Sequence, residues 1–343
     1  DSAMTRLLAL VLCLTLSLAG GVTLAPAPPA DAQAPIVWKV GTGVGPDSPV
    51  NLAAAALDKA LQEKSKGRMK TELHIGNSLA KGEAAHLEGA QLGTIDIVPV
   101  GSAPIGGMFE PTYQALDLPF LWSSRQQVWK VMDGPVGQEL LKKMEAKGAK
   151  AFCFGGGWGF RNMMSNKRAI FTPDDMKGQT IRVQESPTYI SLMKALGANP
   201  VPMPYVEVYL AMKQGTIDGM ELPSFTVTSD KFQEVTKYYS LTRHSYPPIG
   251  WFANLKKYQA LPADLQKALD ESMRAACDAN RKIEVEREKA DFDIMRKAGT
   301  QINEVKDIKQ FQALMKPVYD SVESKVGKEF MTKLNAAIAA AGK

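Results

Sequence analysis

Apolar and polar residues alternate along several short segments of the chain, which is the pattern of β-strands. The alternation is clearest over 69–75, where Met, Thr, Leu and Ile are separated by Lys, Glu and His. Further strands are predicted at 36–42, 97–100, 149–157, 180–183, 216–222, 251–255 and 300–304, with a short extended segment at 201–203. Because helical segments separate these strands, the pattern predicts an α/β fold.

Helices are predicted over 51–64, 81–92, 124–133, 136–147, 187–196 and 205–214. The longest predicted helix covers 263–298, a stretch without Pro or Gly. At about 1.5 Å per residue it would be roughly 50 Å long. A helix of that length does not fit within one small lobe, so it either crosses both lobes or pairs with another chain. The charged run from Glu284 to Lys289 is expected on its solvated face.

Length and composition describe a globular chain of two domains. The chain has 343 residues, of which 45% are hydrophobic and 22% charged, as in ordinary soluble proteins. The net charge of +5 is not concentrated in a basic tract, so no nucleic-acid site is predicted. No zinc-ligand spacing is present, and neither a metal nor a cofactor is expected.

The N-terminus has the pattern of a secretory signal peptide. Arg6 precedes an apolar run, a Pro/Ala-rich stretch follows, and Ala32 to Ala34 form a small-residue cleavage site. We interpret 1–34 as a tag remnant and a signal peptide. The alternative, an uncleaved membrane anchor, is disfavoured because the apolar run is short for a span.

Two cysteines remain after removal of the signal peptide, Cys153 and Cys277. A disulfide is possible, but two buried free thiols are the favoured reading.

Arg182 stands out as the candidate ligand contact. It lies in the predicted strand 180–183, directly before a helix with Ser186 as N-cap and Pro187 at its first position. Ligands of open α/β sheets bind at the carboxyl ends of strands, and a guanidinium matches a carboxylate in charge and shape. Arg182 therefore either clamps a carboxylate ligand or is a surface arginine paired with a neighbour such as Glu185.

Two further features concern the organisation of the lobes. Glycines at 155–159 and the pair Pro247 and Pro248 mark the two expected chain crossings, the glycines because they can absorb backbone rotation. The sequence Gly-Thr-Ile-Asp occurs at 93–96 and again at 215–218, each time after a helix and before a strand. Two lobes built on related units would explain this echo, although four residues can also match by chance.

Seven segments together resemble the solute-binding proteins of TRAP (tripartite ATP-independent periplasmic) transporters, dicarboxylate type. The resemblance covers essentially the whole chain after the signal peptide. Its segments are LDLPFL (116–121), DGPVGQEL (133–140), GFRN (159–162), MKGQTIRV (176–183), ALGANP (195–200), EVYLA (207–211) and GTIDG (215–219).

The resemblance implies a type II-like periplasmic binding protein fold, in which hinge strands join two α/β lobes and a long helix runs along both. The lobe boundaries are expected at 35–158 plus about 247–288 for the first lobe and 159–246 plus about 289–330 for the second, with a C-terminal tail at 331–343. Arg182 falls on the family's carboxylate-binding arginine, Arg161 on a second arginine near the ligand, and Tyr205 on an aromatic position that packs against it.

One position departs from the family pattern. The family commonly has Glu-Asn-Pro where this chain has Glu221-Leu222-Pro223, and Leu222 cannot hydrogen-bond a carboxylate as asparagine can. We therefore expect an apolar part of the ligand near Leu222, and a monocarboxylate, such as a branched, aromatic or 2-oxo acid, over succinate or a sialic acid. Trp158, Tyr205 and Phe225 either line the same wall or serve hinge and core packing.

The resemblance implies a periplasmic binding protein without catalysis, which delivers an organic acid to small and large membrane subunits for ion-driven uptake. Asp47, Asn77 and Glu83 are expected to reach the ligand from the first lobe. A secreted two-domain enzyme, with Glu83 and Glu88 as paired carboxylates, is a rival reading. It is disfavoured because no nucleophile elbow accompanies the three histidines. The binding protein of an ATP-driven importer is a second rival.

Overall fold

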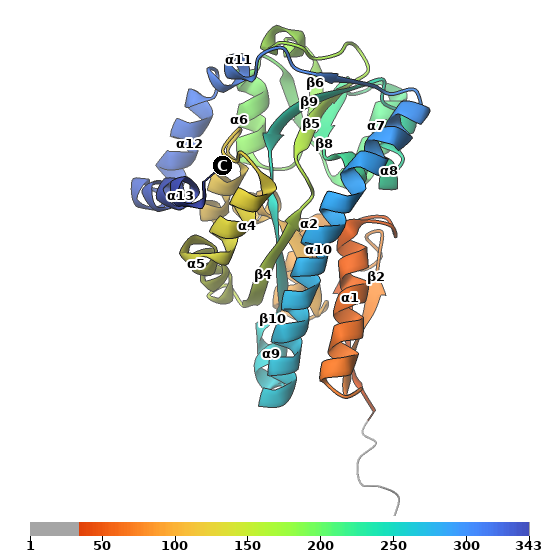
Figure 1. Cartoon of the computed structure of the whole chain (residues 1–343), viewed down its shortest axis with the longest axis vertical. Coiled ribbons are helices and arrows are strands. Elements are labelled where there is room, and N and C mark those ends of the chain that lie inside the picture. The colour runs from red at the N-terminus through yellow and green to blue at the C-terminus, as the bar shows by residue number, and fades with distance from the viewer. Residues whose placement is uncertain (1–33, 343) are drawn as a thin grey trace, which may run out of the picture. The chain divides into compact units, whose positions relative to one another are not determined.

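A computed structural model describes residues 34–342 of the chain. Residues 1–33, which hold almost all of the predicted signal peptide, lie outside it. The described residues form two β-sheets with helices on their faces (Figure 1). Within this part of the chain, no helix is long and apolar enough to cross a membrane.

The two sheets have the same internal order. The first runs β2-β1-β3-β10-β4, and the second runs β7-β6-β8-β5-β9 with β11 added at its edge. In each, the first three strands are parallel, the fourth runs antiparallel to them, and the fifth pairs antiparallel with the fourth. The strands of the first sheet are β1 (Ile36–Gly41), β2 (Met69–His74), β3 (Ile97–Gly101), β4 (Ala149–Gly157) and β10 (Pro248–Asn254). Those of the second are β5 (Arg161–Ser165), β6 (Thr180–Val183), β7 (Asn199–Pro202), β8 (Gly219–Leu222), β9 (Tyr238–Ser245) and β11 (Gln301–Glu304).

Helices connect the strands within each lobe. In the first lobe these are α1 (Pro49–Lys64), α2 (Gly82–Leu92), α3 (Ser102–Met108), the 3-10 helix η1 (Pro111–Asp117), α4 (Arg125–Asp133), α5 (Pro135–Glu145) and α9 (Leu255–Ala260). In the second they are η2 (Pro173–Met176), α6 (Pro187–Ala195), α7 (Tyr205–Gln214), α8 (Ser224–Ser229) and η3 (Phe232–Glu234). The α/β fold with two lobes is thus confirmed.

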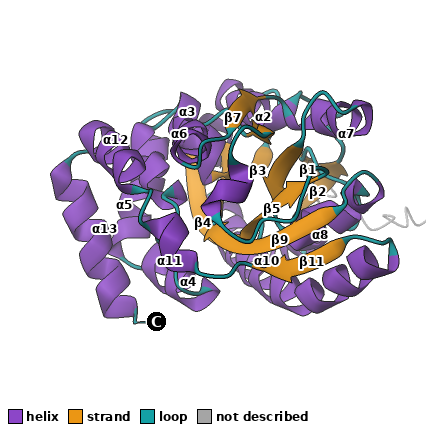
Figure 2. Cartoon of the chain, turned by 90° about the horizontal axis from the view of Figure 1, so that it is seen from above, coloured by secondary structure: helices purple, strands orange, loops and turns teal. Residues whose placement is uncertain are grey.

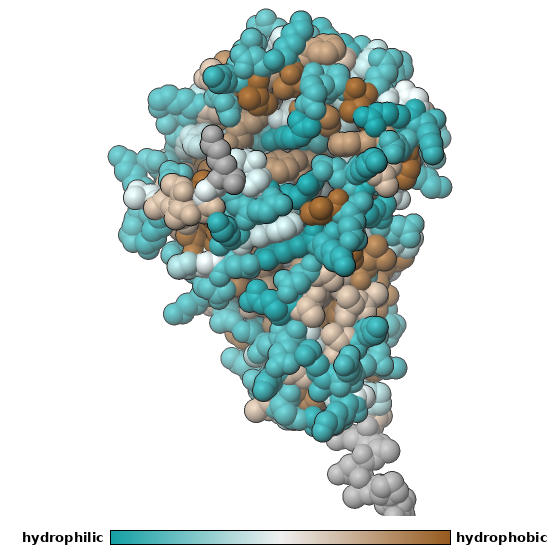
Figure 3. Space-filling view, viewed as in Figure 1, coloured by the Kyte–Doolittle hydropathy of each residue, from teal (hydrophilic) through white to brown (hydrophobic). Residues whose placement is uncertain are grey.

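The long helix α10 (Ala263–Lys297) lies along both lobes, which confirms the first of its two expected roles (Figure 1). It packs on α1 and β4 in the first lobe and on α8 and β11 in the second. The face of the molecule that carries it is largely hydrophilic (Figure 3), and residues such as Lys282, Glu286 and Lys289 are exposed there. The expectation that Glu284 belongs to this solvated face is wrong, because Glu284 is only 3% exposed.

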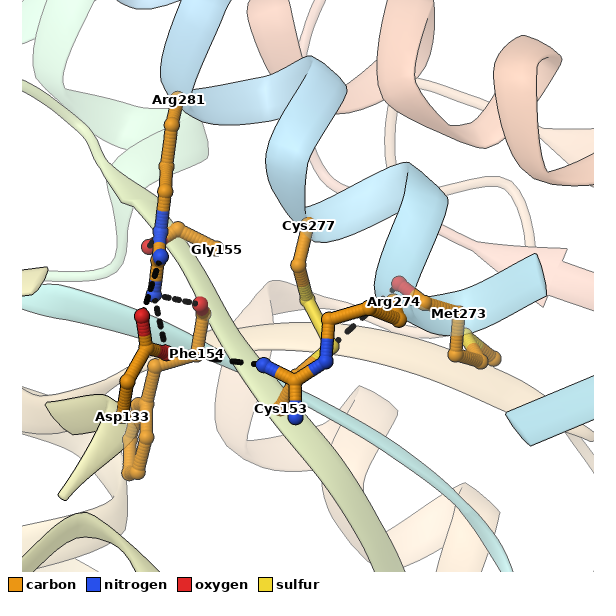
Figure 4. The surroundings of a disulfide bond; sticks show 8 residues. All are labelled: Asp133, Cys153, Phe154, Gly155, Met273, Arg274, Cys277 and Arg281. Carbon is orange, nitrogen blue, oxygen red and sulfur yellow. Dashed lines mark hydrogen bonds and ion pairs between the residues drawn. A yellow bond between two sulfur atoms is a disulfide. The ribbon is translucent and has the colours of Figure 1, made fainter. Parts of the chain in front are cut away.

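Cys153 and Cys277 form a disulfide bond between β4 and α10, so the prediction of two free thiols is wrong (Figure 4). The two residues are 124 positions apart in sequence, and their Cα atoms are 6.6 Å apart. The pairing depends on how the long helix packs on β4, which no local pattern reveals.

The glycines at the first crossing are required by close packing. An added Cβ at Gly155 would lie 2.5 Å from Asn280 Oδ1, and one at Gly156 would lie 2.7 Å from Glu284 Oε2. At Gly157 it would meet the Tyr246 ring at 2.6 Å. Such distances are shorter than any ordinary van der Waals contact. The crossing glycines therefore let α10 and Tyr246 approach the strand.

The C-terminal part of the described chain is helical. The helices are α11 (Ile308–Gln312), α12 (Lys316–Val326) and α13 (Lys328–Ala341), and they gather on one side of the molecule (Figures 1 and 2). The segment expected as a tail begins inside α13, where Phe330, Met331 and Leu334 are buried. Helix α12 packs on both η1 and α6, so it also joins the two lobes.

Candidate functional site

A cavity of about 580 Å³ lies between the two lobes, at the carboxyl ends of their parallel strands. Its polar and charged lining residues come from both sides: Thr42, Asn77, Lys81, Glu83, His86 and Glu88 from the first lobe, and Arg161, Arg182, Gln184, Glu185, Tyr205, Glu207 and Thr226 from the second. Val44, Met108, Trp158, Val206 and Leu222 add apolar surface. The position matches the ligand sites of open α/β sheets.

Arg182 is buried at the cavity wall, with only 3% of its surface exposed. Its Nε and Nη2 donate to the carbonyl oxygen of Met203, at 3.0 and 2.8 Å. Its Nη1 is buried without a hydrogen-bond partner among the described residues. Burial lowers the pKa of Arg182 to about 10, and the nearby Arg161 adds to this effect, so the group stays charged at neutral pH. Arg182 is therefore not a surface arginine paired with Glu185, which is exposed.

Arg161 is also buried in the wall, but its charge is already compensated. Its guanidinium forms an ion pair with Glu221, in which Nη2 is 2.8 Å from Oε1, and Nη2 also donates to the Glu221 carbonyl. Although burial alone would raise it, the pKa of Glu221 is lowered by Arg161 and by His244. Glu221 is fully buried behind Arg161 and does not line the cavity.

Glu83 faces the two arginines from the first turn of α2. Its Oε2 accepts a hydrogen bond from the backbone N–H of Gly101, at 3.2 Å. Burial raises the pKa of Glu83 to about 7, although Gly101, Arg161 and Arg182 all act to lower it. This carboxyl group therefore changes its charge near neutral pH.

The first turns of two helices point into the cavity from opposite lobes. Lys81 caps α2 and Pro204 caps α7 without a side-chain hydrogen bond, and the first residues of both helices line the cavity. Free N–H groups and the helix dipole make such ends favourable for anions. Asn77 holds the start of α2, because its Oδ1 accepts from Gly82 N–H and its Nδ2 donates to Gly43. Its side chain is thus committed to the protein.

Aromatic residues form the remaining wall. The ring of Tyr205 lies 5.9 Å from the Arg182 guanidinium carbon, and its hydroxyl donates to Asp230. Trp158 lines the cavity and stacks on Phe225, with ring centroids 5.8 Å apart and planes inclined by 24°. Phe225 lies behind Trp158 and not in the lining itself.

Seven of the ten predicted site residues line the cavity: Arg161, Arg182, Tyr205, Leu222, Trp158, Asn77 and Glu83. Glu221, Asp47 and Phe225 are not among the lining residues. Asp47 is exposed, and its carbonyl oxygen accepts from Arg287 on the outer side of the loop. The polar lining residues His86 and Gln184 were not predicted. Gln184 had a usable signal, because it follows the strand of Arg182.

Comparison with known sequences identifies the protein family of this chain. The profile of the bacterial extracellular solute-binding proteins of family 7 matches residues 40–325. The 2,3-diketo-L-gulonate-binding periplasmic protein YiaO of Escherichia coli is 36% identical over 263 residues, which are 76% of this chain and 79% of that protein. The C4-dicarboxylate-binding periplasmic protein DctP of Rhodobacter capsulatus is 32% identical over 327 residues, or 94% and 96% of the two chains.

A solved structure agrees with these sequence matches. The sugar acid binding protein of Advenella mimigardefordensis in complex with galactonate superposes with a TM-score of 0.86 at 28% identity. The match covers 90% of this chain and 99% of that one.

Proposed function

The chain belongs to the bacterial extracellular solute-binding proteins of family 7, the binding proteins of TRAP transporters, and from this we propose that it captures an organic acid in the cavity between its lobes. The observation that carries the proposal is the buried Nη1 of Arg182, which has no partner among residues 34–342. An unpaired buried donor costs about 1–3 kcal/mol, and more when it is charged. A carboxylate oxygen of the ligand would satisfy it.

The binding step follows from the same geometry. The ligand carboxylate pairs with Arg182 while the first turns of α2 and α7 contribute N–H groups from opposite lobes. Closure of the lobes then removes water from the ion pair, which strengthens the attraction because the local dielectric constant falls. Ligand binding shifts the open and closed populations by its differential affinity for the closed form.

We propose that the protein works in the periplasm and hands its acid to TRAP membrane subunits without chemical change. Membership of an extracellular binding-protein family supports this location. Relatives named for 2,3-diketo-L-gulonate and C4-dicarboxylates support a transport role. No serine or cysteine is among the described residues that line the cavity, and the hydroxyl of Thr42 donates to the amide of Asn51 and not to a base.

The test is the variant Arg182→Lys, assayed by ligand-induced melting shifts with a library of organic acids. Lysine keeps the charge but loses the planar fork. We expect binding to weaken about 10- to 100-fold, since a charged hydrogen bond contributes roughly 1.5–3 kcal/mol. Arg243→Lys is the matched control, because Arg243 forms a two-point contact with Glu304 on the exposed surface. Unchanged affinity in Arg182→Lys would place the carboxylate site elsewhere.

A further inference from the structure

Of the two buried guanidinium groups that the structure describes at the cavity, only one has a direct ion pair. Arg161 and Arg182 are the two buried cations, and Glu221 already neutralises Arg161 through a direct ion pair. Lys81 is a third cation of the lining, but it is exposed to solvent, where water and salt weaken its attraction. One uncompensated guanidinium, that of Arg182, therefore faces the ligand from the buried wall.

Glu83 occupies the side of the cavity opposite these arginines. Its carboxyl group is anchored to the backbone N–H of Gly101 at the end of β3. An added Cβ at Gly101 would lie 3.3 Å from Glu83 Oε2 and 3.1 Å from Trp158 Nε1, so the group is held against the crossing between the lobes. A second anionic group of a ligand would have to share the cavity with this carboxyl group.

His86, one turn along α2 from Glu83, offers an acceptor as well. The Nδ1 of His86 lies 2.8 Å from the carbonyl oxygen of Gly82. A carbonyl only accepts, so Nδ1 carries the hydrogen and Nε2 is left as an acceptor. Both His86 Nε2 and Gln184 Oε1 are buried without a partner among residues 34–342. A hydroxyl group can donate to such atoms, whereas a carboxylate cannot.

We propose that Glu83 restricts the cavity to acids with one carboxylate, whose other end donates hydrogen bonds. The inference rests on the proposed function and assigns its selectivity to a residue other than the arginine clamp. A dicarboxylate would bring its second charge towards Glu83, where like charges repel, and it could not donate to the acceptor His86 Nε2 on the same helix. A monocarboxylate ending in a hydroxymethyl group meets neither problem.

The ionisation of Glu83 gives the proposal a signature in pH. The charged groups that act on it are Arg161 and Arg182 from the second lobe and Asp117 from η1, and burial likewise raises the pKa of Asp117 to about 7. His86, on the same helix, has a pKa lowered by burial and stays neutral. As pH rises through 7, Glu83 gains its charge. Discrimination against dicarboxylates should therefore increase from pH 6.5 to pH 8.

The experiment compares acids that differ only at one end. Gluconate and glucarate form one pair, and 4-hydroxybutyrate and succinate form another; a pair built on the best binder of the acid library is added. Dissociation constants are measured by calorimetry for the wild type, for Glu83→Gln and for Glu63→Gln. Glu63 is exposed on α1, outside the cavity lining, so this control removes the same charge elsewhere.

We expect the wild type to prefer the monocarboxylate of each pair that binds. Glu83→Gln should bind the dicarboxylate roughly tenfold more tightly than the wild type, an effect of the size expected for removing a nearby like charge, and should lose the pH dependence of the preference. Glu63→Gln should keep the preference for the monocarboxylate and the pH dependence of that preference. Equal or tighter binding of dicarboxylates by the wild type, with no change in Glu83→Gln, overturns the inference and leaves carboxylate binding standing. Binding of no acid by the wild type overturns the inference together with the proposed function.

Discussion

We expect Leu222 to place an apolar side chain at the ligand, where the resemblance implies a hydrogen-bonding asparagine. It ends β8, is only 2% exposed and lines the cavity close to the arginines. In the variant Leu222→Asn, acids with an extra polar group should gain about 2- to 10-fold in affinity relative to apolar acids, since a neutral hydrogen bond contributes roughly 0.5–1.5 kcal/mol. Melting shifts across the acid library give the ranking, and Leu222→Met controls for altered packing. An unchanged ranking contradicts the apolar wall.

The site shows which residues a sequence can identify. Arg182 was identifiable because a strand, an N-cap and a proline follow one another within a few residues, and these local signals fix the strand end. The ion pair between Arg161 and Glu221 could not be identified from the sequence. It depends on the pairing of β5 with β8, which sets Met163 beside Glu221 across 58 positions of the chain. The exposed position of Asp47 was equally hidden, because the loop after β1 turns its backbone towards α10.

The repeated Gly-Thr-Ile-Asp sequence marks equivalent elements in the two lobes. Each copy begins with the glycine that caps helix α2 or α7 and has a positive φ. The side chain of Asp96 accepts from the backbone N–H of Lys39 at 2.7 Å, and that of Asp218 accepts from Thr180 at 2.7 Å. β1 and β6 are the central strands of the three parallel strands in their sheets, so the same polar contact stabilises an equivalent β-α-β-α-β unit in each lobe. The repeated sequence therefore marks a repeated structural unit.

Some helices and strands were predictable from the sequence and others were not. The helix at 205–214 and the strand at 180–183 were predicted with the bounds that the structure has. Helices α3 and α8 have only seven and six residues, too few for a helical repeat to show. Strands β5 and β9 were missed as well. Most of their residues are buried on both faces, so their sequences do not alternate.

The disulfide should contribute measurably to stability, because it joins β4 to α10 across 124 positions. Closing so long a loop restricts the unfolded chain and typically stabilises a protein by about 2–4 kcal/mol. The double variant Cys153→Ser with Cys277→Ser should therefore melt several degrees below the wild type in calorimetry. A reducing agent should lower the melting temperature of the wild type and leave that of the double variant unchanged. Equal melting of both proteins would contradict a structural role for the bond.

At the scale of the whole molecule, three segments of the chain pass from one lobe to the other, and they meet at Glu284. Besides α10 itself, these are the connection from β4 to β5 and that from β9 to β10. Tyr246, in the second connection, donates to Glu284 Oε2 at 2.6 Å and accepts from the backbone N–H of Gly157 at 2.7 Å. Arg125 on α4 donates to Glu284 Oε1 at 2.7 Å. We propose lobe boundaries at these crossings, so opening would bend the chain around one buried carboxyl group.

This carboxyl group predicts how stability depends on pH. Burial raises the pKa of Glu284 from 4.5 to about 7, although Arg125 and Tyr246 act to lower it and Glu288 raises it further. Between these values the folded chain binds more protons than the unfolded chain, so the free energy of unfolding should fall as the pH rises from 5 to 7 and level off above. Glu83 and Asp117 add to the fall, because burial raises their pKa values likewise.

Urea unfolding of the ligand-free protein at pH 5.5, 6.5 and 7.5 measures this dependence. Glu284→Gln should reduce the slope by up to about 1.4 kcal/mol per pH unit, the contribution of one proton. Glu288→Gln controls for the ion pair, because it removes the other carboxylate beside Arg125. A slope that is the same in Glu284→Gln and the wild type would mean that Glu284 is already ionised in the folded protein. The hinge would then hold a complete ion pair with Arg125, and its stiffness would not change with pH.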